Sequence, residues 1–247
     1  MYPSFIHNYA ILFLERVDST NNYAAMLEKQ SNVQHKTVIL TSFQEKGRGQ
    51  NQNSWQAKEG ENLLFSLYIK PTSVAIKDQF TISRISALAL YDCLNYFLQK
   101  KPSIKWPNDL FVGDKKIAGM LIENSLKEKE LERSIIGIGL NVNQMDFGDL
   151  NATSLKKESR QDWQLQRILE YFLDRFDHYL GMLSDVESIH RSFDSKLRFF
   201  EEWHIFKKSK VGPFEGRILG TSNEGELIVE DEFHRHHRFQ HKEIDLS

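Results

Sequence analysis

A short polar segment between two apolar runs carries the first residues that could do chemistry. The sequence FQEKGRGQNQNSWQAKEGENLLFS covers residues 43–66 and contains Gly47, Arg48 and Gly49 in succession. The two glycines let the backbone bend closely around a ligand, and the planar arginine fork can hold a carboxylate or a phosphate. A Gly-Arg-Gly sequence also occurs in plain turns, and on these three residues alone the turn is the favoured interpretation.

A second such segment, KWPNDL at residues 105–110, ends an apolar run with a cation, an aromatic ring, a proline and an Asn-Asp pair. Side chains at the end of a strand can converge on a ligand, although PND is also a good turn former. A third segment, DKKIAGMLIE at 114–123, contains Lys116 and then Gly119, whose missing side chain would let a ligand approach. The alternative for Lys116 is a solvated lysine of a hairpin.

The fourth segment is GIGLNVN at residues 137–143, where small and apolar residues alternate before the polar Asn141 and Asn143. A bulge or tight packing explains its glycines equally well. Each segment is ambiguous alone, and the four together, in this order, are much more specific.

Short apolar runs between turn signals indicate the strands that must position these segments. They are rich in Ile, Leu, Val and Phe, which predicts strands of one sheet, and they cover residues 10–17, 37–43, 62–69, 103–112, 117–124 and 134–143. Gly113-Asp114 is a two-residue hairpin signal, so the strands on either side of it are expected to be antiparallel neighbours. The sheet is therefore predicted to be mixed.

Helical patterns alternate with these strands. Ser19 or Thr20 can cap a helix, because a hydroxyl satisfies a free N–H of the first turn. The predicted helices cover residues 21–30, 80–101 and, with a break near Gly181, 162–201. From about residue 205 the Gly and Pro turns between short strands predict a small β-barrel. We therefore expect a main domain at 1–204 and a small C-terminal β-barrel domain at 205–247.

Composition limits the classes of function. The 247 residues include 32 Lys and Arg against 34 Asp and Glu, so no global charge favours nucleic acid or an anionic membrane. The single cysteine, Cys93, excludes an intramolecular disulfide framework and fits a reducing compartment. The sequence has neither an N-terminal leader pattern nor 18 uncharged apolar residues in a row, and it predicts a cytoplasmic protein.

In this order, the segments resemble the biotin protein ligase family, the biotin-[acetyl-CoA-carboxylase] ligases. KWPND followed shortly by KxAG is the most specific part of the resemblance, and the Gly-Arg-Gly loop supports it. The similarity covers most of residues 10–145 and rests on DSTN (18–21), FQEKGRGQNQNSW (43–55), NLLFS (62–66), IKWPNDL (104–110), KKIAGMLIE (115–123) and GIGLNVN (137–143). It implies an α+β fold: a mixed β-sheet flanked by helices, like the class II aminoacyl-tRNA synthetase catalytic domain, with a small C-terminal SH3-like β-barrel.

The resemblance implies an ATP-dependent, AMP-forming ligase reaction. The carboxylate of biotin attacks the α-phosphate of ATP, which gives biotinyl-5'-AMP and pyrophosphate. A specific lysine of a biotin carboxyl carrier protein or domain, part of a biotin-dependent carboxylase, then takes the biotin and releases AMP. The first step brings anionic oxygens together and requires fixed cations and usually Mg²⁺. The implied catalytic residues are Arg48, Lys105 and Lys116.

The same resemblance implies a binding role for each matched position. Biotin is expected to contact Ser19, Thr20, Asn21, Gln44, Gly47, Arg48, Lys116 and Gly119. ATP is expected to contact Arg48, Gly49, Gln50, Trp55, Lys105, Asn108 and Asn141, with Trp55 stacked on adenine. Asp109 is the implied Mg²⁺ ligand. The Gly-Arg-Gly loop is expected to be mobile in the empty site and to fold over the adenylate.

The loop departs from the family pattern. Relatives usually carry further Arg and Gly residues after the Gly-Arg-Gly sequence, whereas this chain has Gln50, Asn51, Gln52 and Asn53, which leaves fewer cations to retain the adenylate. A different segment, the His-rich HRHHRFQHKE at 234–243, lacks a paired carboxylate or cysteine ligand set. We interpret it as a solvated, weakly basic edge rather than a metal site.

Three other functions are alternatives. A biotin-responsive DNA-binding regulator needs an N-terminal helix-turn-helix domain, for which motifs that begin at Asp18 leave no room, so the resemblance is to the short form of the family. A lipoate or octanoate ligase has an Arg-Arg-x-Ser-Gly-Gly type of loop, absent here, and the related transferases use a catalytic cysteine, whereas Cys93 lies in an apolar run. A non-catalytic biotin binder stays open. We expect no DNA or membrane partner, and either a monomer or a homodimer.

Overall fold

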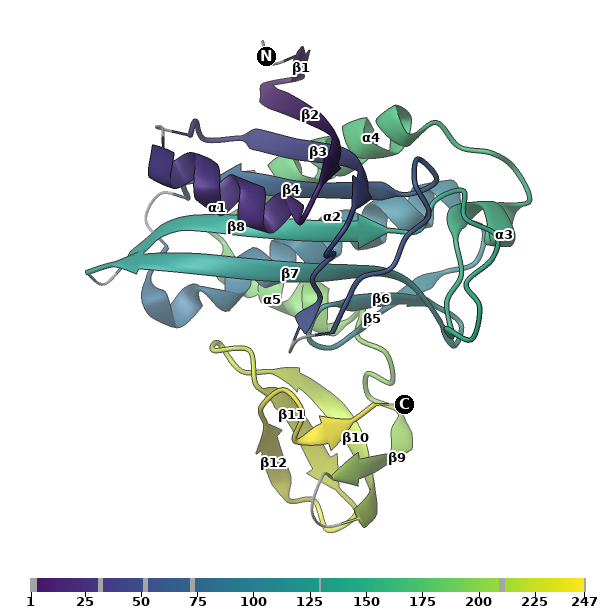
Figure 1. Cartoon of the computed structure of the whole chain (residues 1–247). Helices are drawn as coiled ribbons and strands as arrows, with labels where there is room; N and C mark the ends of the chain where they lie inside the picture. The colour runs from purple at the N-terminus through teal and green to yellow at the C-terminus, as the bar shows by residue number, and fades with distance from the viewer. Residues whose placement is uncertain are drawn as a thin grey trace.

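An eight-stranded mixed β-sheet forms the main layer of the protein (Figure 1). The computed structural model describes residues 4–30, 33–50, 53–71, 74–128, 130–208 and 212–246. The strand order is β1-β2-β3-β4-β8-β7-β6-β5, in which β2 and β3 are parallel and the other neighbours are antiparallel. The strands are β1 (Ser4–Ile6), β2 (Tyr9–Val17), β3 (Thr37–Gln44), β4 (Leu63–Ile69), β5 (Pro102–Lys105), β6 (Asp109–Val112), β7 (Lys115–Lys127) and β8 (Glu130–Leu140).

Helices cover both faces of this sheet. The first helix, α1, packs on β3, β4 and β8 from one side, and the larger helices lie on the other side (Figure 1). The helices are α1 (Thr20–Gln30), α2 (Phe80–Phe97), α3 (Leu155–Ser159), α4 (Leu165–Gly181) and α5 (Val186–Asp194), with a short 3₁₀ turn, η2 (Ile76–Asp78). None of the helices in the described ranges is long and apolar enough to cross a membrane.

Local sequence explains several of these boundaries. The strand β4 is buried along its whole length, as its nearly continuous apolar run predicts for a central strand. Gly113 has φ of 60°, a left-handed conformation that glycine adopts at little cost, and the hairpin that joins β6 to β7 turns there. The predicted break near Gly181 is confirmed, because α4 ends at that residue and α5 begins at Val186.

One predicted strand is wrong. Residues 103–112 form two antiparallel strands, β5 and β6, which pair Lys105 with Asp109 across a turn at 106–108. The turn has a physical cause, since Pro107 has no N–H to donate to a sheet and Asn and Asp favour turns. Asn108 is fixed there, because its carbonyl accepts from Met120 N at 2.9 Å and its Nδ2 donates to Met120 O at 2.5 Å.

A curled five-stranded antiparallel sheet follows the helices and lies below the main sheet in Figure 1. Its order is β12-β11-β10-β9-β13, and its strands are β9 (Trp203–Lys208), β10 (Gly212–Thr221), β11 (Leu227–Asp231), β12 (His236–Phe239) and β13 (Ile244–Asp245). The predicted α+β fold class, a mixed sheet flanked by helices, is confirmed, and in place of the predicted small β-barrel the C-terminal sheet is a curled half-barrel. The proposed domain boundary between residues 204 and 205 stays a prediction.

The two sheets share one hydrophobic core, and a buried arginine links them. Phe206 and Ile218 of the C-terminal sheet belong to the same buried cluster as the helices α2 and α4. Arg84 on α2 is 1% exposed, and its Nη2 donates to Ser222 O at 2.5 Å and to Thr221 Oγ1 at 3.2 Å. Burial lowers the pKa of Arg84 to about 10, so the guanidinium keeps its charge at neutral pH. The C-terminal sheet therefore sits against the helices through both apolar and charged contacts.

Candidate active site

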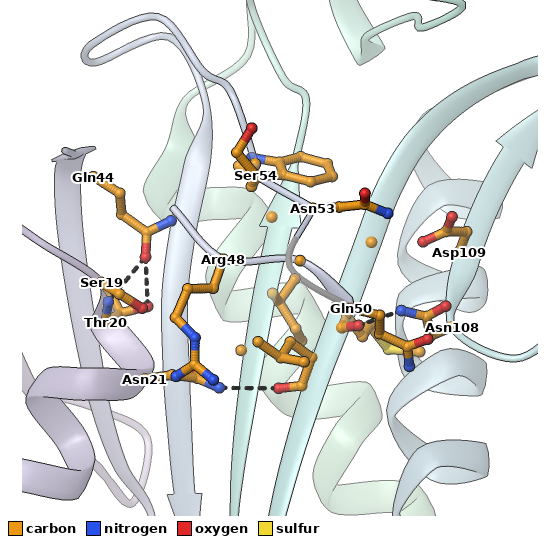
Figure 2. A pocket seen from close by; sticks show the side chains of 18 of the residues that line it. Ser19, Thr20, Asn21, Gln44, Arg48, Gln50, Asn53, Ser54, Asn108 and Asp109 are labelled. Carbon is orange, nitrogen blue, oxygen red and sulfur yellow. Dashed lines mark hydrogen bonds between the residues drawn. The ribbon is translucent and has the colours of Figure 1, made fainter. Parts of the chain in front are cut away.

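Most of the predicted site residues line a single pocket on the α1 side of the main sheet (Figure 2). They come from the turn before α1, the end of β3, the Gly-Arg-Gly loop, the turn before β6, and β7. The predicted residues that line the pocket are Ser19, Thr20, Asn21, Gln44, Arg48, Gly49, Gln50, Trp55, Asn108, Asp109, Lys116 and Gly119. Segments that lie up to about a hundred residues apart in the sequence are thus brought together by the sheet.

A chain of polar contacts builds one wall of the pocket. Gln44 Oε1 accepts from Thr20 N at 2.9 Å and from Thr20 Oγ1 at 3.1 Å (Figure 2). Behind them, Ser66 Oγ lies 2.7 Å from Thr20 Oγ1 and 2.5 Å from Asn21 Oδ1. A Cβ atom on Gly137 would lie 2.4 Å from Asn21 Oδ1, so only glycine leaves room for this amide. The wall therefore presents fixed donors and acceptors to a ligand.

A glycine strip forms the floor, and Trp55 lies on it. Gly119 of β7 and Gly139 of β8 are direct neighbours across the two strands. A Cβ on Gly139 would meet Trp55 Cε2 at 2.3 Å, and one on Gly119 would meet Trp55 Cζ3 at 3.1 Å. The indole Nε1 is buried and has no hydrogen-bond partner among the described residues. The ring therefore packs closely on the floor, with its Nε1 against Gly139.

Lys116 and Asp109 form an ion pair at one side of the pocket. Lys116 Nζ lies 2.8 Å from Asp109 Oδ1 and 5.4 Å from the centre of the Trp55 ring. Asp109 is the acidic residue of the pocket lining, and Asn108 stands beside it. The described residues contain no group of three or more His, Cys, Asp or Glu side chains placed to hold a metal ion. One carboxylate and one amide fit a magnesium ion that takes its other ligands from substrate phosphates and water.

Arg48 projects from a tightly folded loop. Gly49 N donates to Asn53 O at 2.7 Å, and Trp55 N donates to Gly47 O at 2.9 Å. These bonds close a small hairpin around the arginine; Asn51 and Gln52, two members of the amide run that departs from the family pattern, lie outside the described residues. The expected mobility of the empty loop stays a prediction.

Three predicted residues lie outside the lining of this pocket. Lys105 Nζ sits 5.4 Å from the centre of the Phe111 ring and faces a hollow beside the C-terminal sheet. Asn141 is 3% exposed and donates through Nδ2 to Thr153 O at 3.0 Å. Gly47 is buried, and a Cβ there would lie 2.4 Å from the Trp55 carbonyl oxygen. Their contacts with a substrate stay predictions, and the role that the structure gives Asn141 is to tie the segment after β8 in place.

The sequence did not indicate four residues that belong to the site or its support: Ser66, Asn22, Glu123 and His241. Ser66 is the single serine in an apolar strand, a signal that was available. His241 belongs to the His-rich segment and lines the pocket from the C-terminal sheet. Burial and the neighbouring Lys242 lower the pKa of His241, so its imidazole is neutral at pH 7. His241, His234 and His236 are all exposed, so the solvated edge stays our interpretation of this segment, and His241 is the histidine of it that also lines the pocket.

Known proteins resemble this chain in sequence and in structure. The family model described as "Biotin/lipoate A/B protein ligase family" matches residues 13–141, more than half of the 247 residues. The "Bifunctional ligase/repressor BirA" of Bacillus spizizenii is 27% identical over 230 residues, which cover 89% of this chain and 69% of that protein. The "Biotin--[acetyl-CoA-carboxylase] ligase" of Paracoccus denitrificans is 33% identical over 131 residues, which cover 52% of this chain and 53% of that protein. The structure of the biotin protein ligase from Aquifex aeolicus in complex with biotin and ATP has a TM-score of 0.77 at 26% identity and covers 95% of this chain and 97% of that chain.

Proposed function

Since the chain belongs to the biotin/lipoate A/B protein ligase family, we propose that it is a biotin protein ligase. In the first step, a carboxylate oxygen of biotin bonds to the α-phosphorus of ATP, and the bond to pyrophosphate breaks. In the second step, the amine of an acceptor lysine attacks the carbonyl carbon of biotinyl-5'-AMP, and AMP leaves. The amine loses a proton as the amide forms.

One observation carries this proposal: the fold brings a polar wall, a glycine floor and two cations from distant segments into one pocket. A ureido group has N–H donors and a carbonyl acceptor, and the wall of Thr20, Asn21 and Gln44 offers both kinds of partner in fixed positions. The glycine floor beside this wall carries the Trp55 ring in the structure. The fixed donors and acceptors of the wall support biotin as its ligand.

The cations of the pocket can stabilise the negative charge of the first step. A carboxylate and a triphosphate repel each other, and fixed positive groups that face the developing charge lower the barrier. Lys116 forms an ion pair with Asp109 at the pocket. Arg48 reaches the pocket from the loop (Figure 2). We assign Lys116 to the carboxylate and the mixed anhydride, and Arg48 to the carboxylate and the phosphate. Lys105 remains a candidate for the triphosphate.

Magnesium is part of the proposal. A bound Mg²⁺ would neutralise phosphate charge, and Asp109 with Asn108 would hold it together with phosphate oxygens. Trp55 would stack on the adenine ring, since its indole is the large aromatic surface of the pocket lining. The ammonium of Lys116 would face the substrate.

The acceptor is proposed to be a biotin carboxyl carrier protein or domain of a biotin-dependent carboxylase, as the name of the Paracoccus relative implies for that protein. The reaction consumes ATP and modifies an intracellular enzyme, so we propose that the protein works in the cytoplasm. Whether it acts as a monomer or a homodimer stays a prediction.

A direct test is to mix the protein with biotin, MgATP and a carrier domain, and to read the mass of the carrier. We expect a gain of one biotinyl group, no gain when the acceptor lysine is replaced by arginine, and no gain with lipoate or octanoate instead of biotin. If lipoate or octanoate modifies the carrier and biotin does not, the substrate assignment is wrong. If biotin binds but no carrier gains mass, the chain is a binder and not a ligase.

A further inference from the structure

The pocket wall holds the guanidinium of Arg48. Its Nη1 donates to Asn22 Oδ1 at 2.6 Å, and its Nη2 lies 2.8 Å from Glu123 Oε1. A longer contact of 3.4 Å joins Nη1 to Glu123 Oε2, so the carboxylate faces both terminal nitrogens of the arginine. This is the two-pronged arrangement that an arginine makes with a carboxylate ligand.

The Glu123 carboxylate is itself fixed by the polar wall of the pocket. Asn21 Nδ2 donates to Glu123 Oε2 at 2.7 Å and to Leu121 O at 3.1 Å. On β7, residues 119, 121 and 123 share one face because side chains alternate along a strand. Gly119 and Leu121 line the pocket, so Glu123 stands at its end on the same face. Glu123 thus joins the loop arginine to the amide of α1.

We propose that Glu123 is a positioning residue that holds Arg48 in the empty pocket, in the place of the substrate carboxylate, and is exchanged for it when biotin binds. Both carboxylates need the same two terminal nitrogens, so they compete for Arg48. The proposal rests on the proposed function in naming biotin as the incoming anion. The contact between Glu123 and Arg48 that holds the empty loop does not depend on which anion binds.

The exchange of Glu123 for a substrate anion on Arg48 should be easy, and it should be affected by the charge of Glu123. The Arg48 and Glu123 side chains are 41% and 36% exposed, and exposed ion pairs are weak, so a substrate anion can replace Glu123 at little cost. A second carboxylate at the end of the pocket also repels the incoming anion. Removing its charge should therefore tighten the binding of an anionic ligand by about two- to fivefold. It should also release the empty loop.

The test uses Glu123→Gln, which keeps an oxygen acceptor for Asn21 and removes the charge. Calorimetry compares biotin with biotinol, the alcohol that lacks the carboxylate. We expect tighter binding of biotin and no change for biotinol. The matched control is Glu132→Gln, because Glu132 is an exposed glutamate on the adjacent strand whose side chain lies 3.4 Å from Ser125 Oγ, away from Arg48.

A second measurement follows the loop without any ligand. Limited trypsin digestion cuts after the basic residues of the segment at 46–58, and Glu123→Gln should speed this cleavage relative to wild type and to Glu132→Gln. Biotin binding that is unchanged or weaker in Glu123→Gln, or equal tightening of biotinol, overturns the exchange. Unchanged cleavage overturns the hold on the loop. If the wild-type protein binds no biotin, the proposed function fails, and the cleavage rates still decide whether Glu123 holds Arg48.

Discussion

Replacing Gly139 by alanine tests whether the Trp55 indole lies on the glycine floor. The three heavy atoms nearest to a Cβ at this position all belong to Trp55, at 2.3, 2.7 and 2.7 Å. Non-bonded carbon atoms prefer about 3.5 to 4.0 Å, so the ring would have to retreat by more than about 1 Å. Forced overpacking of this kind costs about 1 to 3 kcal/mol, and we expect Gly139→Ala to lower the free energy of unfolding by that amount.

A double-mutant cycle separates this clash from other effects of the methyl group. In a Trp55→Ala background the obstacle is gone, so Gly139→Ala should change the free energy of unfolding by less than about 0.5 kcal/mol. Urea unfolding followed by far-UV circular dichroism measures all four proteins without relying on tryptophan fluorescence. Gly181→Ala is the control for a general glycine effect, because a Cβ there meets nothing within 4 Å. Additive effects of the two substitutions would refute the placement of the indole.

Three further predictions concern the charged groups. Lys116→Ala should reduce biotin-dependent pyrophosphate release by about ten- to a hundredfold while biotin affinity changes less, because the cation acts where charge develops; an unchanged release rate would remove it from the mechanism. Arg48→Gly should release biotinyl-5'-AMP and label serum albumin in a biotin blot, since one lost charge-assisted bond speeds escape by about ten- to a hundredfold; unlabelled albumin with normal carrier modification would contradict this. Burial alone would raise the pKa of Asp231, but hydrogen bonds from His237 and Arg235 lower this pKa well below its ordinary value. The stability that the carboxylate contributes is therefore present above about pH 4 and is lost as the pH falls further. Asp231→Asn should therefore show a flatter fall of Tm between pH 5 and pH 2, and an identical fall in both proteins would exclude this role.

The local sequence was sufficient to predict turns and helix ends whose conformation depends on a few neighbouring residues. Gly113 and the break near Gly181 were predictable because glycine at a turn and the end of an apolar pattern act locally. The strand predicted at 103–112 was wrong because hydrophobic runs on both sides of Pro107 outweighed the turn signal between them. Apolar content indicates burial in a sheet, but it does not say where the chain reverses.

The candidate site was predictable only where a motif carried it. Lys116 and Arg48 belong to matched motifs, whereas Glu123 is one of many glutamates and its meaning comes from Arg48, 75 positions away in the sequence. His241 reaches the pocket because the C-terminal sheet packs beside the turn at 106–108, a tertiary arrangement that no local pattern encodes. The cations could be named from the sequence, but their partners required the fold.

The buried Arg84 has a consequence for the orientation of the C-terminal sheet. Apolar surfaces attract each other in many relative orientations, but a buried guanidinium keeps its hydrogen bonds to Ser222 O and Thr221 Oγ1 in only one of them. Removing one partner from a buried polar network leaves the other groups unpaired and costs stability. We therefore expect Arg84→Met to lower Tm and to seat the C-terminal sheet less uniquely, which would move His241 away from the pocket. Arg84 thus aligns the C-terminal sheet as well as holding it, and this alignment decides which of its residues reach the active site.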